Sequence, residues 1–283
     1  MQTRTLSVEL EQWVVSQALS GSDPSGVLQR LLDDGWPEQD AVDAVAAAVD
    51  AYVAKASRET GLPMPVRVPI VAEPNGASLA DAGDREVRIL ASMLLPRVAV
   101  LGGLLADEEC EAFIELAGPR LVRSTTVEPD TGGDMVHPDR TSHGMGFARG
   151  ENALCQRVEA RIARLLDWPL ENGEGLQVLC YGPGAQYRPH HDYFDPAMPG
   201  SDVLLRRGGQ RVASVVIYLN TPERGGATVF PDVHFEVAAV KGNAVFFSYD
   251  RAHPMTRTLH AGAPVVAGEK WILTKWLRVG AHD

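Results

Sequence analysis

The stretch "QYRPHHDYFDP", residues 186–196, places metal-binding side chains at close spacing. His190 and Asp192 lie two positions apart, and two such residues on a β-strand point to the same face. One imidazole and one carboxylate could therefore bind the same metal ion, while His191 would point away. An HxD pair alone is weak evidence in a chain with eight histidines. A third ligand has to come from another part of the chain.

Histidines nearer the C-terminus could supply that ligand. His260 and His253 are the candidates, and His234 is a weaker one. Two histidines and one carboxylate form the facial triad of non-haem Fe(II) oxygenases, which leaves coordination positions open. A bidentate 2-oxo acid could fill two of these positions and dioxygen a third. The distal carboxylate of such a cosubstrate needs a cation, and Lys270 is a candidate for that role.

The composition is that of a globular protein, with 45% hydrophobic and 22% charged residues among 283. A net charge of −11 argues against nucleic acid or an anionic membrane as the main partner, because both bind basic surfaces. Three cysteines without CxxC spacing indicate neither a disulfide scaffold nor a zinc knuckle. The first 13 residues lack the apolar core of a signal peptide, and we expect a reducing, cytoplasmic setting.

The N-terminal part of the chain is predicted to be helical. Over residues 1–56, apolar residues recur at helical spacing in three segments, and Pro37 suits the first turn of the third. Asp23 or Ser25 could cap the second segment. Residues 57–86 carry four prolines and are predicted to form a linker.

The remaining chain, residues 87–283, has a mixed pattern. Helical spacing occurs around residues 106–118 and 157–168, and short strands separated by turn residues dominate after that. Many short strands at such spacing are typical of a sandwich or barrel. We therefore expect a mainly β domain with flanking helices.

Five motifs in this domain occur together in a fixed order: "YGPGAQYRPHHDYF", "GGQRVASVVIYLN", "GGATVFPDV", "KGNAVFFSY" and "LHAGAPVVAGEKWILTKWLR". With these motifs, residues 95–278 resemble the prolyl 4-hydroxylase type of Fe(II)- and 2-oxoglutarate-dependent dioxygenase, and the soluble bacterial members most closely. The resemblance covers about two thirds of the chain. It implies a double-stranded β-helix (jelly roll) core, and the N-terminal helical segment lies outside this shared core.

The resemblance also implies roles for individual residues. The iron ligands would be His190, Asp192 and His260. The residues that hold the distal carboxylate of 2-oxoglutarate would be Lys270, Tyr181 and Thr228.

Peptide contacts are implied as well. Arg211 and Trp276 fall where family members contact the peptide substrate, whereas Arg278 replaces a residue that is often histidine. Two Gly- and Pro-containing segments, residues 126–140 and 195–210, are candidates for lids over the site.

The implied activity is hydroxylation of an unactivated C–H bond, with peptidyl proline as the first choice of substrate. Dioxygen and 2-oxoglutarate would be cosubstrates, succinate and carbon dioxide products, and ascorbate the reductant. One alternative is a hydroxylase of a free amino acid or a natural-product intermediate. Another is a non-catalytic protein that senses 2-oxoglutarate or iron and binds a protein partner through its helices. A zinc hydrolase is a third alternative, but it does not explain Lys270.

Overall fold

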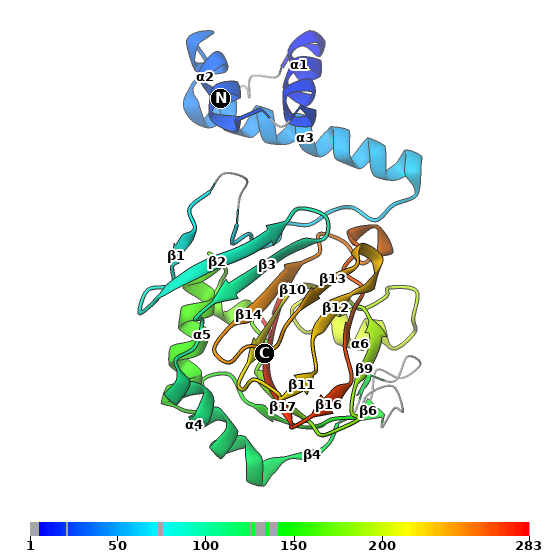
Figure 1. Cartoon of the computed structure of the whole chain (residues 1–283). Helices are drawn as coiled ribbons and strands as arrows, with labels where there is room; N and C mark the ends of the chain where they lie inside the picture. The colour runs from blue at the N-terminus through cyan, green and yellow to red at the C-terminus, as the bar shows by residue number, and fades with distance from the viewer. Residues whose placement is uncertain are drawn as a thin grey trace. The chain divides into compact units, whose positions relative to one another are not determined.

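A computed structural model describes the chain in two compact units, residues 1–65 and 66–283 (Figure 1). The described residues are 6–20, 22–72, 76–124, 126–127, 134–135 and 141–282. None of the helices in these ranges is long and apolar enough to cross a membrane.

The first unit consists of three helices: α1 (Val8–Leu19), α2 (Pro24–Asp33) and α3 (Glu38–Thr60). The predicted helical segment is thus present, and Asp23 caps α2 by accepting a hydrogen bond from the Ser25 amide. Helix α3 runs four residues past the expected boundary at residue 56. It ends at Gly61, which adopts a left-handed φ of 70° that favours glycine.

The second unit is built on a nine-stranded antiparallel sheet. Its spatial order is β1 (Leu79–Asp81), β2 (Glu86–Met93), β3 (Arg97–Gly102), β14 (Ala244–Ser248), β10 (Arg211–Tyr218), β17 (Lys270–Arg278), β8 (Leu176–Tyr181), β7 (His143–Phe147) and β4 (Val122–Arg123). Strand β1 and the first residue of β2 lie inside the expected linker, so its C-terminal part belongs to the sheet.

A four-stranded sheet faces the large one. Its order is β13 (Phe235–Val237), β12 (Thr228–Phe230), β15 (His260–Gly262) and β9 (Tyr187–His190). Two further strand pairs are β11 (Arg224–Gly225) with β16 (Val265–Ala267), and β5 (Thr126–Val127) with β6 (Asp134–Met135). Short 3-10 turns occupy Gly118–Arg120, Leu170–Asn172, Pro231–Val233 and Pro254–Thr256.

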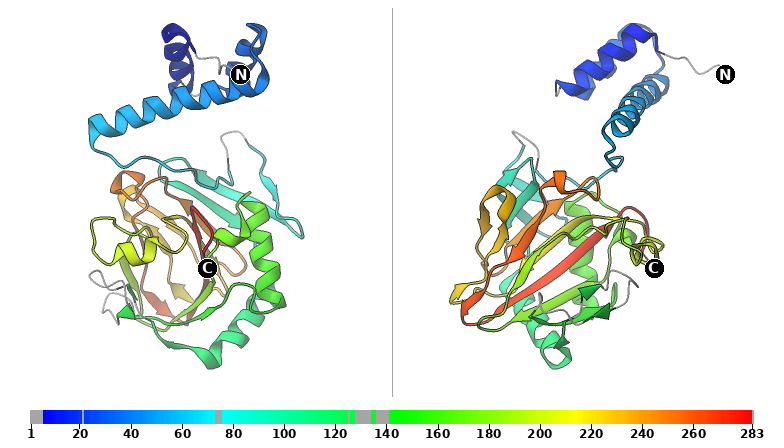
Figure 2. Two further views of the ribbon diagram at one scale, coloured as in Figure 1. Left: turned by 180° about the vertical axis from the view of Figure 1, so that it is seen from behind. Right: turned by 90° about the vertical axis from the view of Figure 1, so that its right-hand side faces the viewer.

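Helices cover the other face of the large sheet. Helices α4 (Asp107–Ala117) and α5 (Ala153–Leu165) lie along it, on the side away from the small sheet (Figures 1 and 2). A short helix, α6 (Ser201–Leu205), follows β9 in the chain. The expected mainly β domain with flanking helices is confirmed, with the two facing sheets of a jelly roll.

The central strands β10, β14 and β17 of the large sheet are buried on both faces, and strand alternation decides which side chains each face carries. Along β10, Val215 and Ile217 pack with the helices, whereas Val216 and Tyr218 belong to the core between the two sheets. Because successive side chains alternate, every second residue of β8, β10 and β17 faces the space between the sheets.

On the helix-facing side of β17, Lys275 pairs with Glu159 of α5 at 2.7 Å, and both side chains are almost fully buried. We expect Glu159→Leu to lower the free energy of unfolding by about 3–5 kcal/mol, because it leaves a buried ammonium unpaired. Urea denaturation measures this. The double variant Glu159→Leu/Lys275→Met should recover most of the loss. A single variant as stable as the wild type would contradict the expectation.

Candidate metal centre

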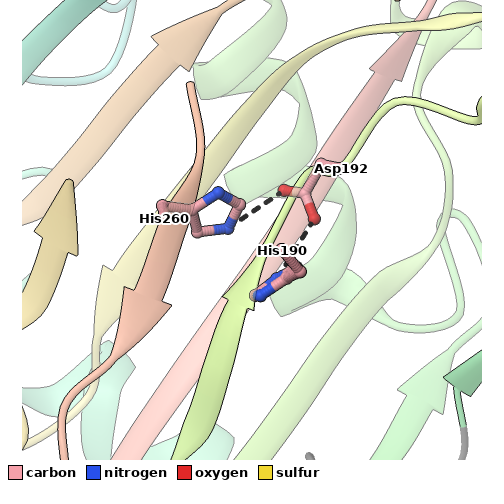
Figure 3. Close-up of side chains that lie close together, drawn as sticks. All are labelled: His190, Asp192 and His260. Atoms are coloured by element: carbon pink, nitrogen blue, oxygen red, sulfur yellow. Dashed lines mark ion pairs between the residues drawn. The ribbon is translucent and has the colours of Figure 1, made fainter. Parts of the chain in front are cut away.

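Strands β9 and β15 bring the two triad histidines together. They pair antiparallel, with His260 directly opposite His190. Asp192 follows β9 by two residues, and its carboxylate points toward both imidazole rings (Figure 3). Residues 70 positions apart in sequence thus share one face of the small sheet.

The three side chains have the separation expected of metal ligands. The His190 Nε2 atom lies 3.6 Å from Asp192 Oδ1, and the His260 Nε2 atom lies 3.7 Å from Asp192 Oδ2. One ligand atom from each residue lies within 4.8 Å of the others. The side chains of Asp192 and His260 are 7% exposed, so an ion bound here would be shielded from bulk water.

Backbone carbonyls orient both rings. The Nδ1 atom of His190 lies 2.8 Å from the Arg188 carbonyl oxygen, and that of His260 lies 3.1 Å from the Thr258 carbonyl oxygen. A carbonyl only accepts, so each Nδ1 carries the proton and donates. Each Nε2 then carries a lone pair with which it can bind a metal, and this tautomer is set by the hydrogen bond at the other ring nitrogen.

The carboxylate of Asp192 is ionised at neutral pH. Burial alone would raise its pKa. The imidazoles of His260 and His190 when protonated, the charge of Arg211 and a hydrogen bond from Ser214 all lower it, and the pKa lies below its usual range. Two neutral imidazole nitrogens and one carboxylate oxygen are the donor set of a non-haem Fe(II) centre. The side chains therefore fit this metal.

A cavity opens beside the triad. Its wall includes Lys270, Ile272, Thr274 and Trp276, the alternate residues of β17 that face the small sheet. The cavity therefore runs along this strand.

Lys270 places a buried cation in the wall of this cavity. Its side chain is buried, and burial lowers its pKa to about 8. The Nζ atom lies 5.8 Å from the ring centre of Tyr181 and 5.7 Å from that of Tyr218. No carboxylate in the described ranges pairs with it. Such a group is suited to an anionic ligand.

Thr228 completes this part of the cavity. Its hydroxyl accepts a hydrogen bond of 2.8 Å from the Tyr218 hydroxyl, which leaves the threonine proton available to an acceptor in the cavity. Lys270, Tyr181 and Thr228, the three residues expected at the distal carboxylate, all line one cavity with the triad.

Comparison with known proteins agrees with this geometry. Residues 176–278 match the 2OG-Fe(II) oxygenase superfamily. Prolyl 4-hydroxylase 5 of Arabidopsis thaliana is 38% identical over 218 residues, which cover 70% of this chain and 72% of the relative. Prolyl 4-hydroxylase 1 of the same plant is 40% identical, with 65% and 69% covered. The chain belongs to the prolyl 4-hydroxylase family of 2OG-Fe(II) oxygenases.

One solved structure similar to this chain is that of a viral collagen prolyl hydroxylase from Paramecium bursaria chlorella virus 1. It is 30% identical and superposes with a TM-score of 0.49, covering 64% of this chain and 95% of the viral one.

Membership of this prolyl 4-hydroxylase family makes the chain a 2-oxoglutarate-dependent dioxygenase, and the family implies Fe(II), 2-oxoglutarate and dioxygen. The relatives do not favour the non-catalytic sensor or the zinc hydrolase. The expected resemblance is confirmed.

The structure places Arg211 beside the cavity. Its guanidinium pairs with Glu174 at 2.7 Å and stacks 4.1 Å from the ring centre of Trp276. Trp276 lines the cavity, whereas Arg211 is not among the described residues of its wall. Arg278 binds the same Glu174 carboxylate at 2.6 Å, and the two arginines hold the pKa of this buried acid at about 2 against the effect of burial.

The remaining histidine candidates lie outside the triad. His191 stacks on Tyr193, with ring centres 4.6 Å apart. His253 accepts a hydrogen bond from the Met255 amide at the start of a 3-10 turn, and His234 ends another such turn. Of the two lid candidates, residues 195–210 contain α6, and residues 126–140 lie mostly outside the described ranges.

Two site residues escaped the sequence analysis. Ser214 donates a hydrogen bond to Asp192, and Tyr249 contacts Ser214 in turn. The available signal was a lone serine in the largely apolar run "VASVVIYL". A polar residue in a strand buried on both faces needs a partner, and only the fold shows which one.

We expect Lys270→Met to stabilise the ligand-free protein. A pKa of about 8 in the fold, against 10.5 for an unperturbed lysine, corresponds to roughly 3 kcal/mol of destabilisation by the buried charge. The penalty is fully present below pH 8 and fades as pH rises towards 10.5, because the folded lysine loses its proton first. The advantage of the variant should therefore shrink over this range in urea denaturation. A variant less stable than the wild type at pH 7 would contradict this.

Proposed function

We propose that this dioxygenase hydroxylates prolyl residues of a peptide or protein. Fe(II) would be held by His190, Asp192 and His260, and 2-oxoglutarate by Lys270. The observation that carries the site is that one cavity joins a metal-ligand triad to a buried lysine that no carboxylate of the described residues neutralises. The names of the relatives, which are prolyl 4-hydroxylases, support the substrate class.

Each group in the cavity has a distinct task in this proposal. Iron, when bound, supplies the activation of dioxygen that oxidation of an unactivated C–H bond needs. Lys270 would pair with the distal carboxylate of 2-oxoglutarate, and the Thr228 hydroxyl would donate to the same group. Apolar walls from Leu179, Val216 and Ile272 would keep water from the reacting centre.

Trp276 and Arg211 are proposed to contact the peptide. The Trp276 indole Nε1 is buried and has no hydrogen-bond partner among the described residues, so it can donate to a substrate carbonyl. Arg211 is fixed by Glu174 and by stacking on Trp276, which supports a role in holding the indole in place.

Three further expectations belong to the proposal. Ascorbate would act as reductant, and the three helices of residues 1–65 would bind a protein partner. Cys110, Cys155 and Cys180 are free thiols, which suits a reducing, cytoplasmic setting.

The test is succinate formation from 2-oxoglutarate, with Fe(II) and ascorbate in air, in the presence of proline-rich peptides. Peptides with each proline replaced by alanine, and free amino acids, serve as alternative substrates. We expect proline-dependent succinate and a gain of one oxygen atom on the peptide by mass spectrometry.

Two variants control this assay. His190→Ala should lose substrate-dependent turnover because it removes a ligand. His234→Asn, at an exposed histidine with positive φ outside the triad, should keep it. Turnover that is equal with the alanine peptides, or that responds to free amino acids alone, would overturn the prolyl substrate. Turnover that survives in His190→Ala would overturn the metal site.

A further inference from the structure

A chain of hydrogen bonds leads from the metal centre into the large sheet. The Ser214 hydroxyl donates to Asp192 Oδ2 at 2.6 Å, and the Tyr249 hydroxyl lies 3.1 Å from the same Ser214 oxygen. Ser214 and Tyr249 are no more than 1% exposed. Neither residue is a metal ligand, so the chain acts only through Asp192.

The direction of these hydrogen bonds follows from the number of protons. Ser214 has one hydroxyl proton, and it points to the carboxylate, which can only accept. The serine oxygen is then an acceptor for Tyr249, whose hydroxyl donates. Tyr249 thereby fixes the serine rotamer, and Ser214 fixes the carboxylate.

Sheet pairing determines where these two hydroxyls lie. Ser214 is on β10 opposite Phe247 of β14, and Tyr249 follows the end of β14. Asp192, by contrast, lies on the segment between β9 and α6. The contact therefore ties the carboxylate of a loop residue to two central strands of the large sheet.

We infer that Ser214 and Tyr249 are positioning residues that restrict Asp192 to binding the metal through a single oxygen. Both carboxylate oxygens face the triad, since Oδ1 lies 3.6 Å from His190 Nε2 and Oδ2 lies 3.7 Å from His260 Nε2. The serine hydrogen bond takes one lone pair of Oδ2 and so favours Oδ1 as the ligand atom. This inference rests on the proposed function and adds the reason that the site can hold all of its reactants.

The reason is the number of coordination positions. Two imidazoles and one carboxylate oxygen occupy three of the roughly six positions of an octahedral ion. A chelating 2-oxo acid and dioxygen together need the other three. If both carboxylate oxygens were bound, only two positions would remain. The 2-oxo acid could chelate there only if these two positions were adjacent, and dioxygen would then have none. A carboxylate free to turn would therefore compete with the cosubstrate.

The test uses Co(II)-loaded protein without oxygen, so that no turnover is involved. The visible absorption of Co(II) reports metal binding and then chelation of 2-oxoglutarate. We expect Ser214→Ala to weaken 2-oxoglutarate binding to the Co(II) protein about 10- to 100-fold, as loss of a residue that orients a ligand does elsewhere. Ser214→Thr, which keeps the hydroxyl, should bind as the wild type does.

Tyr249→Phe tests the hydroxyl at the far end of this hydrogen-bond chain. We expect 2-oxoglutarate affinity to fall by about 2- to 10-fold, less than in Ser214→Ala, because the serine rotamer is no longer fixed. The matched control is Tyr193→Phe, which removes a neighbouring hydroxyl that makes no hydrogen bond to the triad among the described residues. A merely structural role would lower the melting temperature of Ser214→Ala and leave the 2-oxoglutarate affinity of its folded fraction unchanged.

An unchanged 2-oxoglutarate affinity in folded Ser214→Ala would overturn the inference. It would also be overturned if Tyr249→Phe bound 2-oxoglutarate as the wild type does and Ser214→Thr bound it as weakly as Ser214→Ala. Failure of the proposed function looks different. In that case the wild-type protein itself would show no Co(II) absorption band and no response to 2-oxoglutarate.

Discussion

The antiparallel pairing of β9 with β15 sets His190 opposite His260, and the rest of the site is arranged around this pair. Two imidazoles on adjacent strands can share one ion only if the strands keep this register, because a shift of one residue would turn a ring to the other face. The carbonyl oxygen of Arg188 in β9 and that of Thr258, two residues before β15, then fix the tautomer of both rings. The small sheet therefore supplies position and protonation state together.

Strand β17 carries two buried lysines, one in an ion pair beside the helices and one in the wall of the cavity. Lys275 faces the helices and is neutralised by Glu159 at 2.7 Å. Lys270 faces the cavity, where burial lowers its pKa to about 8 and no carboxylate in the described ranges opposes that effect. They lie five positions apart, which places them on opposite faces of the strand. A buried cation without a protein carboxylate is tolerated where an anionic ligand can pair with it.

Near the C-terminal end of β17, Glu174 neutralises two buried arginines. It binds both Arg211 and Arg278, and Arg278 also donates to the carbonyl oxygens of Leu204 and Gly209. The segment that follows Asp192 is thus tied to the large sheet by a buried, charged cluster. Arg211 donates to the Asp192 carbonyl as well, at 3.4 Å, so the cluster reaches the backbone of a metal ligand. Position at the metal is set from several elements at once.

The sequence by itself determined the types of element and most of the ligand chemistry. Apolar spacing predicted the three N-terminal helices and the short strands, and the five ordered motifs identified the family and the candidate ligands. It misplaced the linker, because prolines early in residues 57–86 hid a strand that forms only by pairing with β2. Only the tertiary structure decided that Ser214 and Tyr249 meet Asp192 and that Arg211 is bound by Glu174. Those contacts join residues 22 to 37 positions apart. They depend on strand register and burial, which no local sequence pattern encodes.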